Sequence, residues 1–233
     1  MNVFKISPLA ALALLSMLGC NSSTPEPGNQ ANTAQSSESV EAPQSEPPKE
    51  APPASTGDVS DRKPKDGEEV GVLDTGSGRI VVMFFPDKAP KMVARFKECL
   101  TKGIYTGTYF HRVIPGFMIQ GGDPNTKNSD RADDGQGGYG SMLPAEFNDV
   151  KHVRGILSTA RTSDPNSAQS QFFIMHGTSP SLDNQYTVFG KVVEGLDVVD
   201  KIVNQPRDPN DNPKDHKAVT ITKASLEKWP VSK

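Results

Sequence analysis

The chain contains few cysteines, no excess of basic residues and a modest share of apolar ones. Its 233 residues include two cysteines, which excludes a disulfide-rich scaffold and a four-cysteine zinc site. The formal net charge of −3 lacks the basic excess of a general nucleic-acid binder, so we expect no nucleic-acid partner. The apolar share of 34% is slightly below that of ordinary soluble domains, even after the 20 glycines are added.

The apolar deficit is concentrated in residues 21–66. No aromatic residue lies between Phe4 and Phe84, and the segment 21–66 holds eight prolines and a charge of −4. Such a segment cannot bury enough apolar surface to offset its chain entropy, so we predict a disordered tether rich in proline, serine and glutamate. A proline-rich tether of this length reaches up to about 140 Å, at roughly 3.1 Å per residue.

Residues 1–20 have the pattern of a secretory signal. Lys5 precedes the apolar stretch Leu9–Leu18, which is too short to span a bilayer as a helix. The ending Leu18-Gly19-Cys20 resembles a bacterial lipobox, in which the cysteine is lipidated, although Leu18 stands where a small residue is usual. We therefore expect an exported protein that a lipid on Cys20 anchors to a membrane, facing the periplasm or the cell exterior. Secretion without an anchor is the alternative.

From residue 67 to residue 233 the pattern predicts one mainly β domain. Val70–Asp74 and Arg79–Phe85 flank a glycine-rich turn, which is typical of a β-hairpin. Helices are predicted from Pro90 to Gly103 and from Leu196 to Val203. Further strands are predicted at Tyr109–Val113, Phe117–Gln120, Gly155–Ala160, Phe172–Met175, Val188–Val193 and Val219–Ala224. Many short strands with two helices favour a closed, eight-stranded antiparallel β-barrel capped by the two helices.

The second cysteine, Cys99, lies on the apolar face of the first predicted helix. Its neighbours on that face include Phe96 and Leu100. We interpret Cys99 as a small buried hydrophobe; a reactive thiol is the alternative.

Three segments place polar side chains among large apolar ones. The first, Phe110–Asp123, has the sequence FHRVIPGFMIQGGD. The second, Gly155–Arg161, has the sequence GILSTAR and leads through a polar loop to Ser170–Ile174, SQFFI. The third, Leu182–Val192, has the sequence LDNQYTVFGKV. With these segments in this order, the chain resembles the cyclophilins, the cyclosporin-binding family of peptidyl-prolyl cis–trans isomerases, over about residues 69–226.

The resemblance implies a role for individual residues. It makes Arg112 the catalytic residue. It implies that the proline pocket is lined by Phe117, Met118, Phe173 and Leu182, with Tyr186 in place of the family's pocket histidine. It implies that Gln120, Ala160 and Gln171 contact the substrate backbone or the residue before proline. The family's tryptophan before the pocket leucine is Ser181 here, so we expect weak cyclosporin binding.

Several of these assignments have structural alternatives. Because side chains alternate along a strand, one of Phe172 and Phe173 must face the core and the other the cleft. We assign Phe173 to the cleft on the resemblance. Tyr186 could instead pack structurally, and for His111, next to Arg112, we favour a structural role. The segment Asp208–Pro213 has oxygen ligands at suggestive spacing but proline where a calcium loop needs glycine, so we interpret it as a solvated turn.

The resemblance implies an isomerase that accelerates the rotation of X–Pro bonds in exported proteins. Its partners would be proline-containing polypeptides, and we expect a monomer with no cofactor and no metal. One alternative is a non-catalytic module or holdase that binds proline-containing peptides on the same fold. Another is a barrel that carries a small apolar ligand, although a barrel of this size is usually filled by its own side chains.

Overall fold

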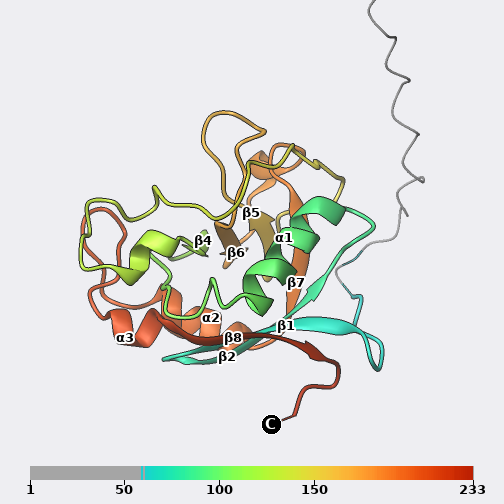
Figure 1. Cartoon of the computed structure of the whole chain (residues 1–233), viewed down its shortest axis with the longest axis horizontal. Helices are drawn as coiled ribbons and strands as arrows, with labels where there is room; N and C mark the ends of the chain where they lie inside the picture. Colours follow the sequence, from blue (N-terminus) through green and yellow to red (C-terminus); the bar gives the residue numbers. More distant parts are fainter. Residues whose placement is uncertain (1–58, 60, 233) are drawn as a thin grey trace, which may run out of the picture. The chain divides into compact units, whose positions relative to one another are not determined.

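The computed structural model describes residue 59 and residues 61–232 (Figure 1). The predicted signal segment 1–20, with its lipidation candidate Cys20, and residues 21–58 of the predicted tether lie outside the described residues. Across the described part, no helix combines the length and the apolar character that are needed to cross a membrane.

The described part is built around one antiparallel sheet of eight strands (Figure 1). Along the chain, these strands are β1 Glu69–Thr75, β2 Gly78–Phe84, β3 Arg112–Ile114, β4 Met118–Gly121, β5 Ile156–Thr159, β6 Phe172–Met175, β7 Val188–Glu194 and β8 Ile221–Lys228. Their order across the sheet is β3-β4-β6-β5-β7-β2-β1-β8. The predicted mainly β, eight-stranded antiparallel fold is confirmed.

The sheet curls into a half-barrel whose two edge strands, β3 and β8, do not pair as strands. The chain just before β3 meets the chain at the start of β8 instead. Gly107 N donates to Ile221 O at 2.8 Å, Ile221 N to Thr108 O at 2.8 Å, and Phe110 N to Val219 O at 3.2 Å. These few bonds link the two edges of the half-barrel, so the sheet is not the fully closed barrel that was predicted.

Two predicted strands lie elsewhere than expected. Instead of Tyr109–Val113, β3 begins at Arg112, and Tyr109 forms only an isolated bridge to Thr220. Instead of Val219–Ala224, β8 begins at Ile221, because a short helix, α3 His216–Val219, precedes it. The Asp215 side chain caps this helix by accepting hydrogen bonds from the backbone of its first turn.

The two predicted helices are present. Helix α1, Pro90–Thr101, begins at proline as expected and ends before Gly103, which has a φ of +67°. Helix α2, Leu196–Val203, buries its predicted apolar side. Cys99 on α1 is fully buried, and burial raises the pKa of its thiol to about 11. The interpretation of Cys99 as a core residue is therefore confirmed.

The core forms two clusters on opposite faces of the strands. The first lies under α1 and centres on Phe96, whose ring lies 4.9–5.8 Å from the rings of four other aromatic residues. The second contains Met118 and Phe173, with Leu182 and Tyr186 packed at its margin. The two faces of β6 thus pack into different clusters, because Phe172 belongs to the first and Phe173 to the second.

Described residues that precede residue 67 contact the β domain. Val59 is buried in the second cluster, where Trp229 also packs. Arg62 forms ion pairs with Glu68 at 3.4 Å and with Asp87 at 3.6 Å. The last residues of the predicted tether therefore pack against the domain, which was not expected from their polar composition.

Replacement of Phe96 by alanine tests the dependence of the fold on the first cluster. We expect Phe96→Ala to lower the free energy of unfolding by about 3–5 kcal/mol, because it leaves a cavity among packed rings. The matched control is Phe147→Ala, at a phenylalanine that is 42% exposed. We expect the control to cost less than about 1 kcal/mol. The free energy of unfolding of both variants is measured by urea unfolding. Equal decreases in the two variants would contradict the conclusion that the first cluster depends on Phe96.

Candidate active site

An apolar cavity of about 130 Å³ opens on the outer face of β4 and β6. Met118 begins β4, Phe173 lies in β6, and Leu182 ends the short 3₁₀ turn Pro180–Leu182. The full lining is Arg112, Phe117, Met118, Gln120, Ala160, Arg161, Phe173, Leu182 and Tyr186. The structure therefore brings together all but one of the residues that the resemblance singled out, the exception being Gln171.

Aromatic side chains form one wall of the cavity. The rings of Phe173 and Tyr186 meet edge to face, with centroids 5.7 Å apart and planes at 79°. Phe172, the neighbour of Phe173, points into the first core cluster. Strand alternation thus operates as expected here, and Phe173 is the phenylalanine on the cavity side. Tyr186 also lies in the wall, as its assignment to the pocket requires.

A buried histidine braces this wall from behind. His152 stacks on Phe173, and its Nδ1 lies 3.2 Å from Asp183 Oδ1. Its Nε2 lies 3.1 Å from Ser158 Oγ in β5. The Ser158 hydroxyl also lies within hydrogen-bond distance, 2.9 Å, of Thr187 O. The loop that carries Leu182 and Tyr186 is thereby tied to the sheet, so the cavity has a fixed shape.

Arg112 stands at the mouth of the cavity. It is exposed in β3, directly opposite Gln120 of β4. Within residues 61–232, its side chain has no ion pair and no hydrogen bond. An arginine offers several N–H donors in a planar fork. Those of Arg112 are therefore available to a bound molecule.

Two glutamine amides form a fixed polar edge beside Arg112. Gln120 Nε2 donates to Gln171 Oε1 at 2.9 Å, and Gln171 Nε2 donates to Gly135 O at 2.8 Å and Gly137 O at 2.7 Å. The buried Asp123 holds this loop by accepting from the backbone N–H groups of both glycines. A side chain at Gly137 would clash with Asp123, since its Cβ would lie 2.1 Å from Oδ1.

Gln171 itself lines a neighbouring hollow of about 370 Å³. This hollow shares Gln120, Ala160 and Arg161 with the apolar cavity. The backbone N–H of Ala160 is already used, because it donates to Gln171 O at 3.0 Å. The residues predicted to contact the substrate backbone thus lie along the edge between the two hollows.

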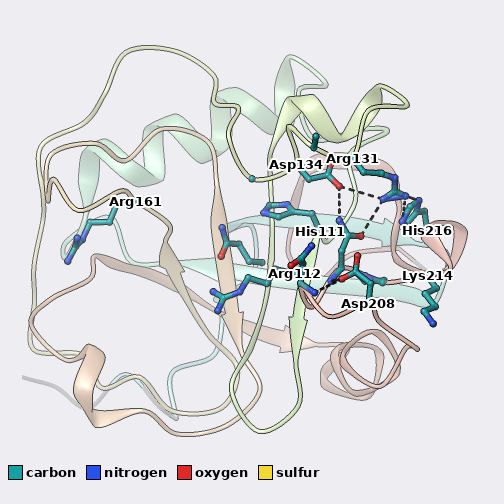
Figure 2. Close-up of a pocket in the computed structure, with 14 residues that line it drawn as sticks. His111, Arg112, Arg131, Asp134, Arg161, Asp208, Lys214 and His216 are labelled. Atoms are coloured by element: carbon teal, nitrogen blue, oxygen red, sulfur yellow. Dashed lines mark hydrogen bonds and ion pairs between the residues drawn. The ribbon is translucent and has the colours of Figure 1, made fainter. Parts of the chain in front are cut away.

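A larger hollow of about 960 Å³ extends from Arg112 on another side (Figure 2). It also shares Gln120 and Arg161 with the cavity. Its remaining lining comes from His111 and from residues 131–135 and 208–216, including the segment interpreted from the sequence as a solvated turn. Sequence reasoning missed this hollow because two loops far apart in the chain form it.

Arg161 is a second basic residue that sequence reasoning left without a role. Its guanidinium lies 4.4 Å from the centroid of the Tyr186 ring, a cation–π contact. It donates to Gln185 O at 3.0 Å and to Thr162 O at 2.8 Å. Its position directly after Ala160 was the one signal that could have placed it at the cavity.

His111 lies beneath the loop that carries Gly135. It is 6% exposed, and neither ring nitrogen has a hydrogen-bond partner among the described residues. Burial lowers the pKa of His111 below its ordinary value; Asp123 and Asp134 oppose this effect and Arg112 adds to it. His111 is therefore neutral near pH 7.

Within residue 59 and residues 61–232, no group of three or more histidine, cysteine or acidic side chains could hold a metal ion.

Comparison with known proteins identifies the family. The family described as "Cyclophilin type peptidyl-prolyl cis-trans isomerase/CLD" matches residues 71–226. A Brucella abortus (strain 2308) protein named "Probable peptidyl-prolyl cis-trans isomerase" is 47% identical over 153 residues, which are 64% of this chain and 78% of that protein. A Synechococcus elongatus peptidyl-prolyl cis–trans isomerase is 43% identical over 138 residues, 58% of this chain and 90% of that protein.

Solved structures agree with this result. A cyclophilin type isomerase from Cryptosporidium parvum, crystallised in the presence of the dipeptide Ala-Pro, matches with a TM-score of 0.62 and 33% identity. The match covers 68% of this chain and 99% of that one. The chain therefore belongs to the cyclophilin-type peptidyl-prolyl cis–trans isomerases.

Proposed function

We propose that the apolar cavity holds the proline ring of a polypeptide while Arg112 stabilises the twisted form of the preceding peptide bond. Rotation about this bond costs about 18–20 kcal/mol because amide resonance is lost. No nucleophile or proton transfer is required. A catalyst needs to bind the twisted amide more tightly than either planar form. The observation that carries the proposal is the guanidinium of Arg112, which lies at the cavity mouth and has no hydrogen bond or ion pair to residues 61–232.

The chemistry of the twisted amide explains why an arginine is suited to this step. Once resonance breaks, the prolyl nitrogen regains a lone pair that can accept a hydrogen bond. The guanidinium stays protonated at all working pH values and offers a rigid fork of donors. An interaction that forms only in the twisted state raises the rate tenfold for each 1.36 kcal/mol or so. The mechanism uses no cofactor.

The remaining site residues position the substrate. The cavity wall of Phe173, Leu182 and Tyr186 is apolar and braced, which suits a proline ring. The Gln120–Gln171 amide pair has a fixed orientation beside it, which suits contact with an extended backbone. The Cryptosporidium relative was crystallised in the presence of the dipeptide Ala-Pro, which contains the X–Pro bond that we propose as the substrate here.

We further propose that the substrates are exported proteins that fold outside the cytoplasm. The signal-like residues 1–20 and the lipobox-like ending at Cys20 support this proposal. A long polar tether would let a membrane-anchored enzyme reach chains that emerge some distance away. Slow proline isomerisation limits folding there, since uncatalysed exchange takes about 10–100 s.

Replacement of Arg112 tests the mechanism. We expect Arg112→Ala to lower kcat/KM for an Ala-Pro peptide by roughly 10²- to 10³-fold, mainly through kcat, because the lost interaction belongs to the twisted state. Arg154→Ala serves as the matched control, since Arg154 pairs with Asp200 away from the cavity. A proline-isomerisation assay on both variants decides. Equal rates for Arg112→Ala and the unaltered chain would remove Arg112 from the mechanism, and no acceleration by either would favour a binding module.

The neutral state of His111 next to Arg112 predicts a pH dependence of stability. Its folded-state pKa lies below the unfolded value of about 6.5, so the unfolded chain takes up the proton first as the pH falls. The contribution of neutral His111 to the free energy of unfolding is thus complete above about pH 6.5. It is lost as the pH falls through the folded-state pKa. We expect urea unfolding to show a lower free energy of unfolding at about pH 5 than at about pH 7.5, and a smaller difference in His111→Leu. An undiminished difference in that variant would show that His111 does not contribute.

The membrane anchor has its own test. We expect mass spectrometry of the mature protein from a bacterial host to find a diacylglycerol-modified cysteine, Cys20, at the N-terminus. Cys20→Ser should then leave the protein in the soluble fraction after cell lysis. An unmodified N-terminus at another residue would contradict the anchor and would favour plain secretion.

A further inference from the structure

The hollow of about 960 Å³ beside Arg112 is larger than the proline cavity, and apart from the residues that the two share its lining has no part in the proposed isomerisation step. We call it the flanking hollow. Because it shares Arg112 and Gln120 with the proline cavity, one end of a polypeptide held by its proline can extend along it. The charges in the flanking hollow would then act on residues that neighbour the proline.

The flanking hollow carries a net positive charge. Its cations are Arg112, Arg131, Arg161 and Lys214, and its carboxylates are Asp134 and Asp208. Its two histidines add no charge near neutral pH, because burial lowers the pKa of both His111 and His216. The chain as a whole has a net charge of −3, so this positive region is local.

Each carboxylate already has protein partners through one of its two oxygens. Asp134 accepts hydrogen bonds from Tyr109 and from Asn212 Nδ2, and it pairs with Arg131 at 3.5 Å. Asp208 Oδ1 accepts backbone N–H groups at 2.8 Å and 2.9 Å within its own loop. These acidic groups therefore stabilise the walls of the hollow and are poorly placed to bind a cation of the substrate.

Among the cations, Lys214 is the one left for a substrate carboxylate. Arg131 is paired with Asp134, Arg161 is held by backbone carbonyls over Tyr186, and Arg112 faces the reacting amide. Within residues 61–232, the Lys214 ammonium has no hydrogen bond and no ion pair. Its backbone is nevertheless fixed, since Lys214 N donates to Pro206 O at 2.8 Å.

The loop that carries Lys214 is closed on itself. Asp208 N donates to Asn212 O at 2.9 Å, and Arg207 pairs with Asp211 at 3.1 Å. Figure 2 shows Lys214 and Arg161 on opposite sides of Arg112. If the proline of an extended polypeptide lies beside Arg112, either the residues before it or the residues after it come near Lys214, but not both.

We propose that the flanking hollow selects proline-containing polypeptides that carry an aspartate or glutamate a few residues to one side of the proline, with Lys214 as the specificity-determining residue. This inference rests on the proposed function, because it assumes that the proline occupies the apolar cavity. Opposite charges across a binding surface raise the association rate and favour one partner over another.

The test uses the full chain and a series of short alanine-rich peptides with one proline. Glutamate, glutamine or lysine is placed in turn at each of several positions before and after the proline, and kcat/KM is measured for each peptide. We expect glutamate to exceed glutamine by about two- to fivefold at positions on one side of the proline, the range of an exposed ion pair. Lysine at the same positions should be the poorest. The ratio should fall toward one at about 1 M salt, where charges are screened within about 3 Å.

Charge reversal assigns the effect to one residue. In Lys214→Glu, we expect the order of the glutamate and lysine peptides to invert. The matched control is Lys223→Glu, at an exposed lysine of β8 that does not line the hollow, and here the glutamate-to-glutamine ratio should stay as in the unaltered chain.

The possible failures have separate meanings. Normal acceleration of every peptide with no effect of charge would overturn the selectivity and leave the proposed function intact. A glutamate preference that persists in Lys214→Glu, or that occurs equally on both sides of the proline, would also overturn it. No acceleration of any peptide would overturn the proposed function and this inference with it.

Discussion

The register of four neighbouring strands is the constraint on which the site depends. One row across β3, β4, β6 and β5 contains Arg112, Gln120, Phe173 and Ser158. Opposed residues of antiparallel strands share a face, so pairing alone puts the guanidinium, the amide and the aromatic wall side by side. The adjacent row, Val113, Ile119, Ile174 and Leu157, is buried in the first cluster. Because a slip of one residue would expose that apolar row, its burial holds the functional row in register.

Different physical interactions determine the shape, the hydrogen-bonding groups and the charge of the site. Burial and ring packing shape the cavity that we propose for the proline ring, and His152 connects its outer loop to the sheet. Fixed hydrogen bonds orient the amides of Gln120 and Gln171. Positive charge is concentrated at Arg112 and in the adjoining hollow, where in the proposed mechanism it acts on the rotating bond and on the residues that flank it. Such a division suits a reaction that makes and breaks no covalent bond.

The sequence predicted those features of the fold and the site that depend on local pattern. The first helix, the buried Cys99, the hairpin and the alternation of Phe172 and Phe173 follow from spacing that short segments carry themselves. The resemblance added roles for individual residues, and the structure brings all but Gln171 into one cavity.

What the sequence did not predict depends on contacts between distant segments. Whether Tyr109 continues a strand depends on where the chain meets Thr220, more than a hundred residues later. Val59 was assigned to the polar tether, because its burial in the second cluster depends on residues that lie far along the chain. The segment Asp208–Pro213, which directly precedes Lys214, was interpreted only as a solvated turn, because its place beside Arg112 comes from tertiary folding.

The most direct test of the central claim separates binding from rotation on the enzyme. Exchange NMR on an Ala-Pro peptide, with the full chain and with Arg112→Ala at saturating protein, reports the dissociation constant and the cis–trans exchange rate of the bound peptide in one sample. The account predicts that the variant still binds the peptide through the apolar cavity while bound-state exchange slows by roughly 10²-fold or more. A variant that binds and exchanges the peptide as fast as the unaltered chain would contradict it.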